Sequence, residues 1–205
     1  MKYDADIVEG CFRLYNGTQF YPGYSHPFDV SDKWTGQLQG YAWGKVFRAE
    51  LFAHSCFPED YLFEDSLMTL VLYPRCHRIV IIPADIYVYR FNPMGITATC
   101  GRTPRAVESL LVTLQLMEDN VACGQQPDMQ AYHNFLRNEV SNTFFTIFSL
   151  QTPSVNHHVF SAYCRLIHQY FSGFSTSKPH LKALEHALRC KDYRACLLAV
   201  MTREE

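Results

Sequence analysis

The sequence is poor in charged residues and has no excess of either sign. Charged residues make up 19% of the 205 positions, hydrophobic residues make up 48%, and the formal net charge is −2. This composition excludes a disordered tail and fits a globular core. Acidic and basic residues are nearly balanced before and after Cys100, so neither half offers the basic surface that nucleic-acid binding requires. We therefore expect no nucleic-acid partner.

Short-spaced cysteine pairs, long hydrophobic runs and nucleotide-binding glycine motifs are also absent. The eight cysteines are scattered without a CxxC pair, and the histidines, including His157, His158, His180 and His186, lack the spaced partners typical of zinc sites. A metal- or redox-active Cys/His protein is therefore the weakest alternative, and we expect reduced thiols, several of them buried. No apolar run reaches the roughly 18 residues of a membrane span. The expected location is cytoplasmic, including a peripheral position at the inner membrane face.

The N-terminal part of the chain shows strand and turn signals. Residues 6–15 mix apolar and polar residues as a strand does, and Asn16-Gly17 is a strong hairpin signal. Residues 18–21 are then expected to return as the partner strand. Residues 22–40 are polar and rich in Gly and Pro, which predicts a loop.

The next part of the chain carries helical and strand-like patterns in turn. The apolar spacing of residues 41–54 predicts a helix. A loop follows and is expected to become helical after Glu64. Residues 78–82 and 86–91 read as two buried strands, separated by Pro83-Ala84-Asp85.

The C-terminal part of the chain is predicted to be helical throughout. Thr103-Pro104 has the pattern of a helix start, with Thr able to cap and Pro suited to the first turn. A second helix is expected from about Asp128 and a third across residues 159–170. A fourth begins at about Pro179 and breaks at Lys191-Asp192 before a last short helix. Their wide apolar stripes require packing against one another or against the sheet.

Four segments of the first hundred residues occur in an order that evokes one protein family. They are Trp43-Gly44-Lys45-Val46-Phe47-Arg48, Phe57-Pro58-Glu59 leading to Glu64-Asp65, the strand at 78–82, and Tyr87-Val88-Tyr89-Arg90-Phe91-Asn92. Family 2 glycosyltransferases have similar segments: a W-G-K helix, an F-P-E loop ending in E-D, and a Y-x-Y-R strand. Over residues 4–100, the chain resembles the acceptor-side, C-terminal half of such an enzyme.

The resemblance implies an α/β fold. It predicts a partial GT-A-like (nucleotide-diphospho-sugar transferase) mixed sheet over residues 1–100 and a helical subdomain over residues 101–205. The implied function is inverting transfer of a hexosyl group from a nucleotide sugar to a glycan or lipid-linked acceptor, as in bacterial polysaccharide biosynthesis. The rival hypothesis is a non-catalytic glycan-binding or assembly module derived from a glycosyltransferase.

The family's front half, which holds the nucleotide sugar and a divalent metal (Mn or Mg), is not represented in the sequence. We therefore expect the chain alone to be inactive, to hold no metal, and to bind a nucleotide sugar only when that half is supplied. Asp4-Ala5-Asp6 spells the family's metal-binding D-x-D pattern. Because it leads into a strand instead of following one, it is not expected to bind metal. A sheet without its usual cover also predicts a homo-oligomer.

The family's catalytic base corresponds to Asp65. Inverting transfer needs a carboxylate that takes the proton from the acceptor hydroxyl as it attacks the anomeric carbon. The resemblance assigns this role to Asp65, with Glu64 orienting the acceptor or tuning Asp65 through its charge. The alternative is that both are solvated acids at a helix N-terminus.

Four further residues are candidates for substrate binding. Trp43 could form a platform for a sugar ring and Lys45 could bind acceptor or phosphate; the alternative is a buried anchor with a surface lysine. Tyr89 and Arg90 end the second predicted strand, where the guanidinium could face the leaving diphosphate. Alternatively, Arg90 pairs with Asp85 or Glu64. The family's Ser-Ile step after this strand is replaced by Met94-Gly95-Ile96, so no serine contact is expected there.

Overall fold

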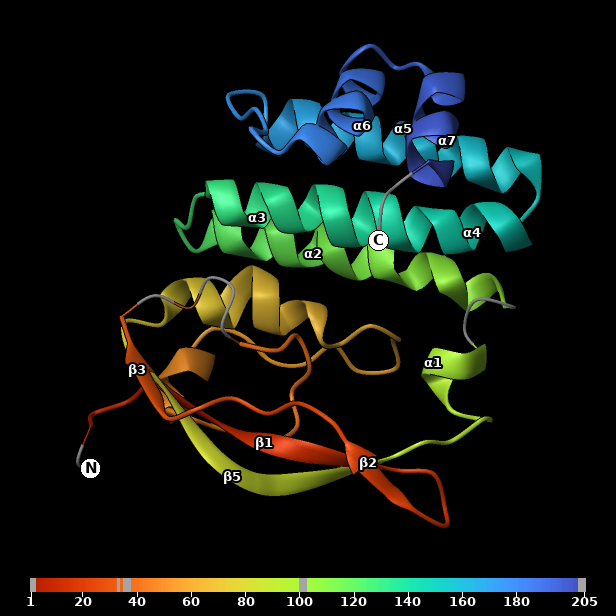
Figure 1. Cartoon of the computed structure of the whole chain (residues 1–205). Coiled ribbons are helices and arrows are strands. Elements are labelled where there is room, and N and C mark those ends of the chain that lie inside the picture. Colours follow the sequence, from red (N-terminus) through yellow and green to blue (C-terminus); the bar gives the residue numbers. More distant parts are fainter. Residues whose placement is uncertain (1–2, 33, 35–37, 100–102, 203–205) are drawn as a thin grey trace. The chain divides into compact units, whose positions relative to one another are not determined.

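The computed structural model describes residues 3–32, 34, 38–99 and 103–202; Cys100 and position 101, where the two predicted domains meet, lie outside this part. The chain forms two compact units (Figure 1). The first comprises Met1–Glu59 and Glu64–Ala98, and the second comprises Asp60–Phe63 and Thr99–Glu205.

The first unit is built on a curled mixed sheet. Its strands are β1 (Ile7–Tyr15), β2 (Phe20–Pro22), β3 (Asp29–Ser31), β4 (Lys45–Phe47) and β5 (Ile79–Arg90). The sheet has the order β2-β1-β5-β3, with β4 also pairing with β1; β1 and β5 are parallel and the other pairs are antiparallel. The predicted first strand and hairpin are confirmed. Asn16 Oδ1 accepts hydrogen bonds from the backbone N–H groups of Thr18 (3.0 Å) and Gln19 (2.9 Å), which fixes the turn.

The two strands predicted on either side of Pro83-Ala84-Asp85 are a single strand, β5. Its pairing with β1 shifts register beside Gly10 and Cys11, which face Ile82 and Asp85, so Pro83 and Ala84 bulge out of the ladder. Proline fits such a position because it has no N–H to donate. The prediction of burial is correct only for the beginning of β5. Ile79 to Ile81 are buried, whereas Ile86 is 46% exposed and Val88 48% exposed.

The helix predicted over residues 41–54 is wrong. The segment forms β4, which pairs antiparallel with β1, and then a short helical turn η1 (Ala49–Phe52). Gly44, just before β4, has φ = 71°, a left-handed conformation that interrupts a helix and favours glycine. Tertiary pairing with β1 therefore overrides the helical spacing of a short apolar run.

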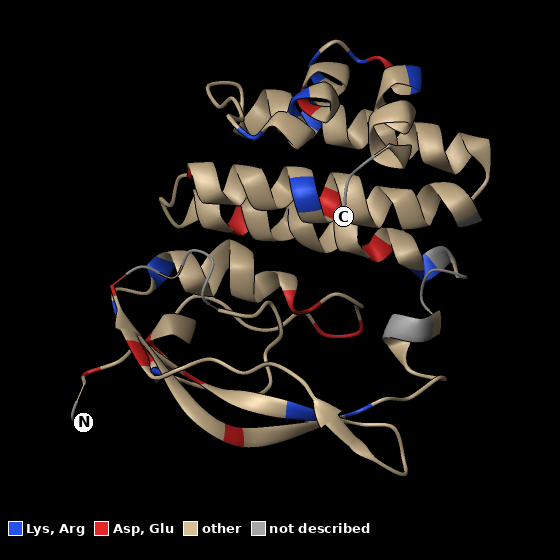
Figure 2. Cartoon of the chain, viewed as in Figure 1, with Lys and Arg blue, Asp and Glu red and all other residues tan. Residues whose placement is uncertain are grey.

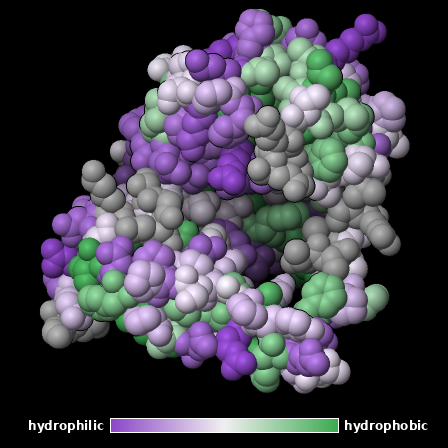
Figure 3. Space-filling view, viewed as in Figure 1, coloured by the Kyte–Doolittle hydropathy of each residue, from purple (hydrophilic) through white to green (hydrophobic). Residues whose placement is uncertain are grey.

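A helical segment after Glu64 completes the core of the first unit, as predicted. It contains η2 (Met68–Leu72) and η3 (Tyr73–Arg75), and it buries Leu67, Met68 and Leu72 completely. Like the beginnings of β1 and β5, where Ile7 and Ile79 are buried, these side chains belong to the apolar core. Hydrophobic residues still reach the surface at several places on the face seen in Figure 3.

The second unit is helical. Its elements, with the short α1 that precedes it, are α1 (Ile96–Thr99), η5 (Pro104–Val107), α2 (Glu108–Ala122), α3 (Met129–Asn134), η6 (Phe135–Thr143), α4 (Phe144–Leu150), α5 (Pro153–Tyr170), α6 (Pro179–Arg189) and α7 (Tyr193–Met201). The predicted starts near Asp128 and after Asp192 are confirmed, because each carboxylate accepts a hydrogen bond from the backbone N–H three residues later. Pro104 begins η5 as predicted, but the capping hydrogen bond expected from Thr103 is not formed.

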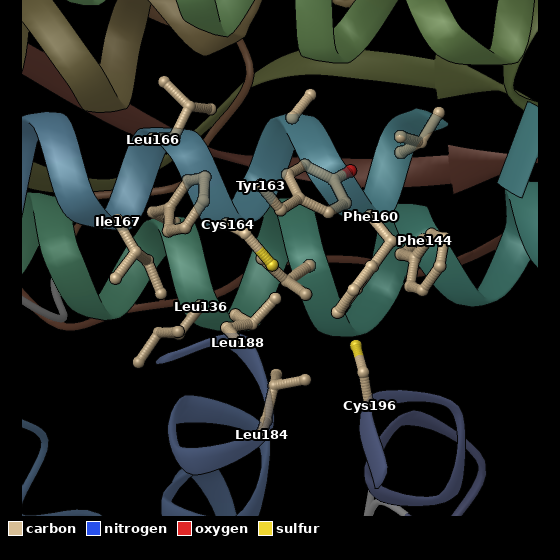
Figure 4. Close-up of a cluster of buried hydrophobic side chains, with 14 of the residues drawn as sticks. Leu136, Phe144, Phe160, Tyr163, Cys164, Leu166, Ile167, Leu184, Leu188 and Cys196 are labelled. Carbon is tan, nitrogen blue, oxygen red and sulfur yellow. The ribbon is translucent and has the colours of Figure 1, made fainter. Parts of the chain in front are cut away.

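The helical unit has one continuous apolar core. Side chains of η6, α4 and α5 interdigitate with those of α6 and α7, and Tyr163, Phe160, Leu188 and Cys196 lie within this cluster (Figure 4). The seven cysteines of the described residues are free, and Cys11, Cys76, Cys164 and Cys196 are buried, as predicted. No helix in the described ranges is long and apolar enough to cross a membrane. Acidic and basic residues are interspersed over both units (Figure 2).

Candidate functional site

Asp65 lies in the turn that opens the helical segment of the first unit. Its Oδ1 accepts a hydrogen bond from the backbone N–H of Ala42 at 3.0 Å, and no donor among the described residues reaches Oδ2. The carboxylate thus contacts a distant loop and not the first turn of its own helix, which argues against the helix-cap alternative. Burial raises the pKa of Asp65, and the nearby Glu64 charge adds to this effect, while the Ala42 hydrogen bond and Lys45 oppose it.

Glu64 is exposed beside Asp65 and raises its neighbour's affinity for a proton through like charge. The residue before it, Phe63, has φ = 69°, a conformation that costs a bulky L-residue about 1–2 kcal/mol. Backbone strain of this kind concentrates at functional sites. The strained residue thus lies directly before the E-D pair.

Lys45 is sealed from solvent. Its side chain is 0% exposed, and its ammonium lies 3.0 Å from Glu9 Oε1, whose side chain is 2% exposed, and donates to the carbonyl of Tyr41 at 2.7 Å. Burial lowers the pKa of Lys45 and raises that of Glu9, and each partner's charge acts against this loss of ionisation. Lys45 is thus neither a surface lysine nor open to solvent, and its charge acts on Asp65 from within the unit.

Trp43 belongs to an aromatic cluster. Its indole stacks on Tyr41 (ring centroids 3.8 Å apart), on Tyr87 (4.4 Å) and on Tyr89 (5.3 Å), and meets Phe12 edge-on. Tyr87 and Tyr89 come from alternate positions of β5 and therefore share one face of the sheet. The loop that carries Tyr41 and Trp43 also supplies the Ala42 N–H to Asp65, so it joins the aromatic cluster to the acid.

Arg90 is not brought to this cluster. As the next residue after Tyr89 on β5, it projects to the opposite face of the strand. It is exposed, and in the described part of the chain it forms no ion pair with Asp85 or Glu64. Of the six predicted site residues, Asp65, Trp43, Lys45 and Tyr89 are therefore linked by contacts or charge, Glu64 flanks them, and Arg90 stands apart.

Two residues of the site were missed by sequence reasoning. Glu9 and Tyr41 hold Lys45 in place, and Glu9 also accepts a hydrogen bond from the backbone N–H of Gln39. An acidic residue at a buried position of a strand is a signal, since a buried charge requires a partner. The partner itself lies 36 positions later in the chain and is recognisable only once β1 and β4 pair.

The D-x-D pattern at the start of the chain has a structural role. Asp4 and Asp6 both pair with Arg48, and Asp6 also accepts hydrogen bonds from the backbone N–H groups of His77 and Arg78. No three His, Cys, Asp or Glu side chains in the described ranges come together in a way that could hold a metal ion. Asp4 and Asp6 are thus held by Arg48 and the backbone, and no metal-ligand cluster forms around them within the described residues.

Comparison with known proteins identifies the fold. No family model and no curated protein matches the sequence. Crystal structures of S. aureus TarS (residues 1–349) in complex with UDP and with UDP-GlcNAc both superpose with a TM-score of 0.62. The sequence identities are 14% and 16%, and the match covers 98% of this chain. The chain spans 59% and 60% of the length of those two chains.

At this identity the likeness shows the fold alone. The mixed α/β arrangement, with its curled sheet and helices, matches part of a GT-A-like glycosyltransferase fold, and the predicted fold class is confirmed. The likeness therefore supports a glycosyltransferase-like fold. It does not single out family 2.

Proposed function

We propose that this chain is the acceptor-side part of a family 2-like glycosyltransferase. The proposed reaction is inverting transfer of a hexosyl group from a nucleotide sugar to a hydroxyl of a glycan or lipid-linked acceptor. The TarS structures contain UDP and UDP-GlcNAc, which makes a UDP-sugar the donor to test first. The proposal depends on the nucleotide-binding part being supplied by further chain or by a partner.

The observation that carries the proposal is the environment of Asp65. One carboxylate oxygen is fixed by the Ala42 N–H, and the other has no donor among the described residues. Its raised pKa makes it a better proton acceptor than an ordinary aspartate, which suits a general base. In the proposed step the acceptor oxygen bonds to the anomeric carbon and gives its proton to Asp65. The bond from that carbon to the diphosphate breaks, and the nucleoside diphosphate leaves with the electron pair.

The other candidate residues have supporting roles in the proposal. Lys45 is a positioning residue, since its side chain is buried and its charge lowers the pKa of Asp65. Tyr87 and Tyr89 extend the aromatic cluster of Trp43 onto the sheet face, where a sugar ring could stack. Glu64 tunes Asp65, and Arg90 offers an exposed guanidinium of the kind that binds a leaving diphosphate.

The aromatic cluster also favours a second candidate, a non-catalytic module that binds glycan. Aromatic rings bind sugars without requiring a metal or a base. In that case the chain would bind an oligosaccharide through the Tyr87 and Tyr89 face, and Asp65 would contribute nothing to turnover. The two functions therefore differ in what happens when only Asp65 is changed.

The test is a transfer assay in which the nucleotide-binding part is supplied by fusion or in trans. With labelled UDP-GlcNAc and an oligosaccharide acceptor, we expect Asp65→Asn to lower the rate by about 10²–10⁴, the usual effect of losing a general base. Asp85→Asn, at an exposed position of β5, is the matched control and should leave the rate unchanged. Circular dichroism should report the same fold for both variants.

Three results would argue against catalysis by Asp65. Transfer that survives Asp65→Asn would remove its role as base, and loss of transfer only through unfolding would make the residue structural. Acceptor binding detected by saturation-transfer NMR, without transfer in any reconstituted form, would support the glycan-binding module instead. In that case Tyr87→Ala should weaken binding while Asp65→Asn leaves it intact.

A further inference from the structure

The helical unit contains an open cleft of about 790 Å³ that the candidate glycosyltransferase site does not use. One wall is a stripe of α5 made by His157, Ser161, Arg165 and His168, which recur at the spacing of one helix face. The opposite wall is the turn between α6 and α7, which contributes Lys191 and Tyr193. Among the described residues no acidic side chain lines the cleft, whereas His157, Arg165, His168 and Lys191 are basic side chains.

The two permanent cations of the cleft are not used by the protein. In the described part of the chain, neither Arg165 nor Lys191 forms an ion pair or a side-chain hydrogen bond. Arg189, at the end of α6, shows the contrast. Its guanidinium pairs with Glu185 at 3.2 Å and also donates to the carbonyl of Phe171. Within the described residues, Arg189 is thus held by several acceptors, whereas Arg165 lines the cleft without an ion pair.

Lys191 occupies a position at which a lysine is costly. It follows α6 with φ = 55°, and the backbone N–H groups of Lys191 and Asp192 bond to the carbonyls of Leu188 (3.2 Å) and Ala187 (2.9 Å). This is the helix-ending motif whose left-handed residue is usually glycine. A lysine there is strained, and it is also one of the residues that line the cleft.

The remaining lining residues suit ligand binding better than thiol chemistry. The His157 ring lies against Tyr193 with ring centroids 3.7 Å apart, which gives the cleft a flat edge beside its cations. Cys164 lies at the floor, where burial raises the pKa of its thiol to about 11 even though the Lys191 charge acts in the opposite direction. A thiol held in its protonated form is a poor nucleophile.

We infer that this cleft is a binding site for a phosphate group, with Arg165 and Lys191 as its two principal ligands. A guanidinium provides a planar fork for phosphate oxygens and an ammonium provides a point charge, and the two together are the usual combination for a phosphate ester. Ser161 and the imidazoles of His157 and His168 supply further polar contacts. The group could belong to a soluble phosphate ester or to a lipid headgroup. The site does not depend on the glycosyltransferase function proposed above.

The test uses the full chain and three probes: inorganic phosphate, glycerol 3-phosphate, and vesicles of phosphatidylcholine with and without phosphatidylglycerol. Titration of the ¹⁵N-labelled protein with phosphate, against chloride at equal ionic strength, should shift the amide signals of Arg165, Lys191 and Tyr193. Arg165→Gln and Lys191→Gly should each weaken phosphate binding about tenfold, the usual effect of removing one charge-assisted hydrogen bond. Lys191→Arg should retain it.

Lys191→Gly separates a binding role from a structural one. Glycine relieves the left-handed strain, so the melting temperature should rise by about 2–4 °C even as phosphate binding weakens. Lys182→Gln, on the exposed surface of α6, is the control for loss of one positive charge. It should change neither the melting temperature nor phosphate binding. The inference is overturned if phosphate produces no shifts in the cleft, if Lys191→Gly and Arg165→Gln bind normally, or if Lys182→Gln weakens binding as much.

The vesicle experiment identifies the source of the phosphate group. Sedimentation with phosphatidylglycerol vesicles that is lost in Arg165→Gln assigns the site to a lipid headgroup. Binding of glycerol 3-phosphate without sedimentation assigns it to a soluble phosphate ester. Either result supports the site. Vesicle binding that persists unchanged in both cleft variants would place the membrane contact elsewhere and contradict the lipid assignment.

Discussion

At the scale of single residues, the candidate site is supported by two opposite charges that are removed from water. Glu9 and Lys45 lie 3.0 Å apart with side chains 2% and 0% exposed. We predict that Lys45→Met destabilises the protein by about 3–5 kcal/mol, because Glu9 is left buried without a partner. The free energy of unfolding, measured by urea titration with circular dichroism, gives this cost directly.

Two further variants separate the buried charge from general disruption. The double variant Glu9→Gln, Lys45→Met should recover most of the loss, since replacing both members of a buried pair is often close to neutral. Arg78→Met removes one partner of the exposed pair with Asp32 and should have little effect. If Lys45→Met were as harmless as Arg78→Met, the pair would not be buried as described.

At the scale of elements, the pairing of β1 with β5 depends on a glycine. A Cβ atom at Gly10 would overlap the side chain of Ile86, at the irregularity where Pro83 and Ala84 leave the ladder. We predict that Gly10→Ala costs about 1–3 kcal/mol, the range for overpacking a close contact. The urea midpoint of the variant measures this cost.

Ile86 provides the matched rescue for this prediction. It is 46% exposed, so Ile86→Ala alone should change stability little. Combined with Gly10→Ala it should restore most of the lost stability, because the overlapping side chain has been removed. Gly23→Ala should not be rescued in this way, since its Cβ would meet the backbone carbonyl of Phe12. If the two substitutions instead lower the free energy of unfolding additively, the predicted overlap between the new Cβ atom and Ile86 is contradicted.

The contact of η6 with α2 contains a buried acid that makes stability depend on pH. Burial raises the pKa of Glu139 to about 7 from the 4.5 of an unfolded glutamate; Thr113 and Ser109 of α2 act in the opposite direction. No hydrogen bond to Glu139 Oε2 forms within the described residues. Between these two pH values the folded chain binds more protons than the unfolded chain. The free energy of unfolding is therefore highest below pH 4.5, where Glu139 is protonated in both states. It falls by about 3 kcal/mol as the pH rises through 7.

Glu139→Gln isolates this contribution, because every other titrating group is common to both proteins. We predict that the free energy of unfolding of the parent, relative to the variant, falls between pH 5 and pH 8. Urea titrations at these two pH values, with both proteins in the same buffers, provide the measurement. If the two proteins show parallel pH profiles, Glu139 is not a buried acid with a raised pKa.

Elements whose limits are set by local hydrogen bonds were predictable from sequence. The helix starts at Asp128 and Asp192 follow from a side chain that caps its own first turn. The conformation of residues 41–54 was not predictable from sequence, because it depends on pairing with β1, more than thirty positions away. The apolar end of β5 was likewise expected to be buried, since composition alone does not show which residues lack a covering layer.

The candidate site divides in the same way. The E-D pair and the Y-x-Y strand were recognisable as local motifs, and the structure brings Tyr89 to Trp43 and fixes Asp65 through Ala42. The distant contacts that set the properties of Asp65 come from Ala42, in the loop before β4, and from the charge of Lys45 in β4. Neither Glu9 nor Tyr41 belongs to a motif, and their roles follow only from tertiary pairing.

At the scale of the whole molecule, the residues of the two candidate sites belong to different units. The acid and aromatic residues belong to the sheet unit, whereas the phosphate cleft belongs to the helical unit. Substitutions at separate sites without shared partners usually have additive effects. Variants of Asp65 and Arg165 can therefore be combined to attribute any observed ligand binding to one unit or the other.

The last prediction concerns the affinity of the chain alone for a nucleotide sugar. The described residues gather no metal-ligand cluster, and the chain spans 59% of the TarS chain crystallised with UDP. We therefore predict that UDP-GlcNAc binds no tighter than about millimolar, roughly −4 kcal/mol. Calorimetry with manganese present should give the same weak heat as calorimetry with EDTA, because no metal-ligand cluster forms among the described residues. Any residual binding of the diphosphate at the cleft should weaken about tenfold in Arg165→Gln. Micromolar, manganese-dependent affinity that survives Arg165→Gln would show that the chain itself carries the donor site, and the proposal that this site must be supplied by further chain or a partner would fall.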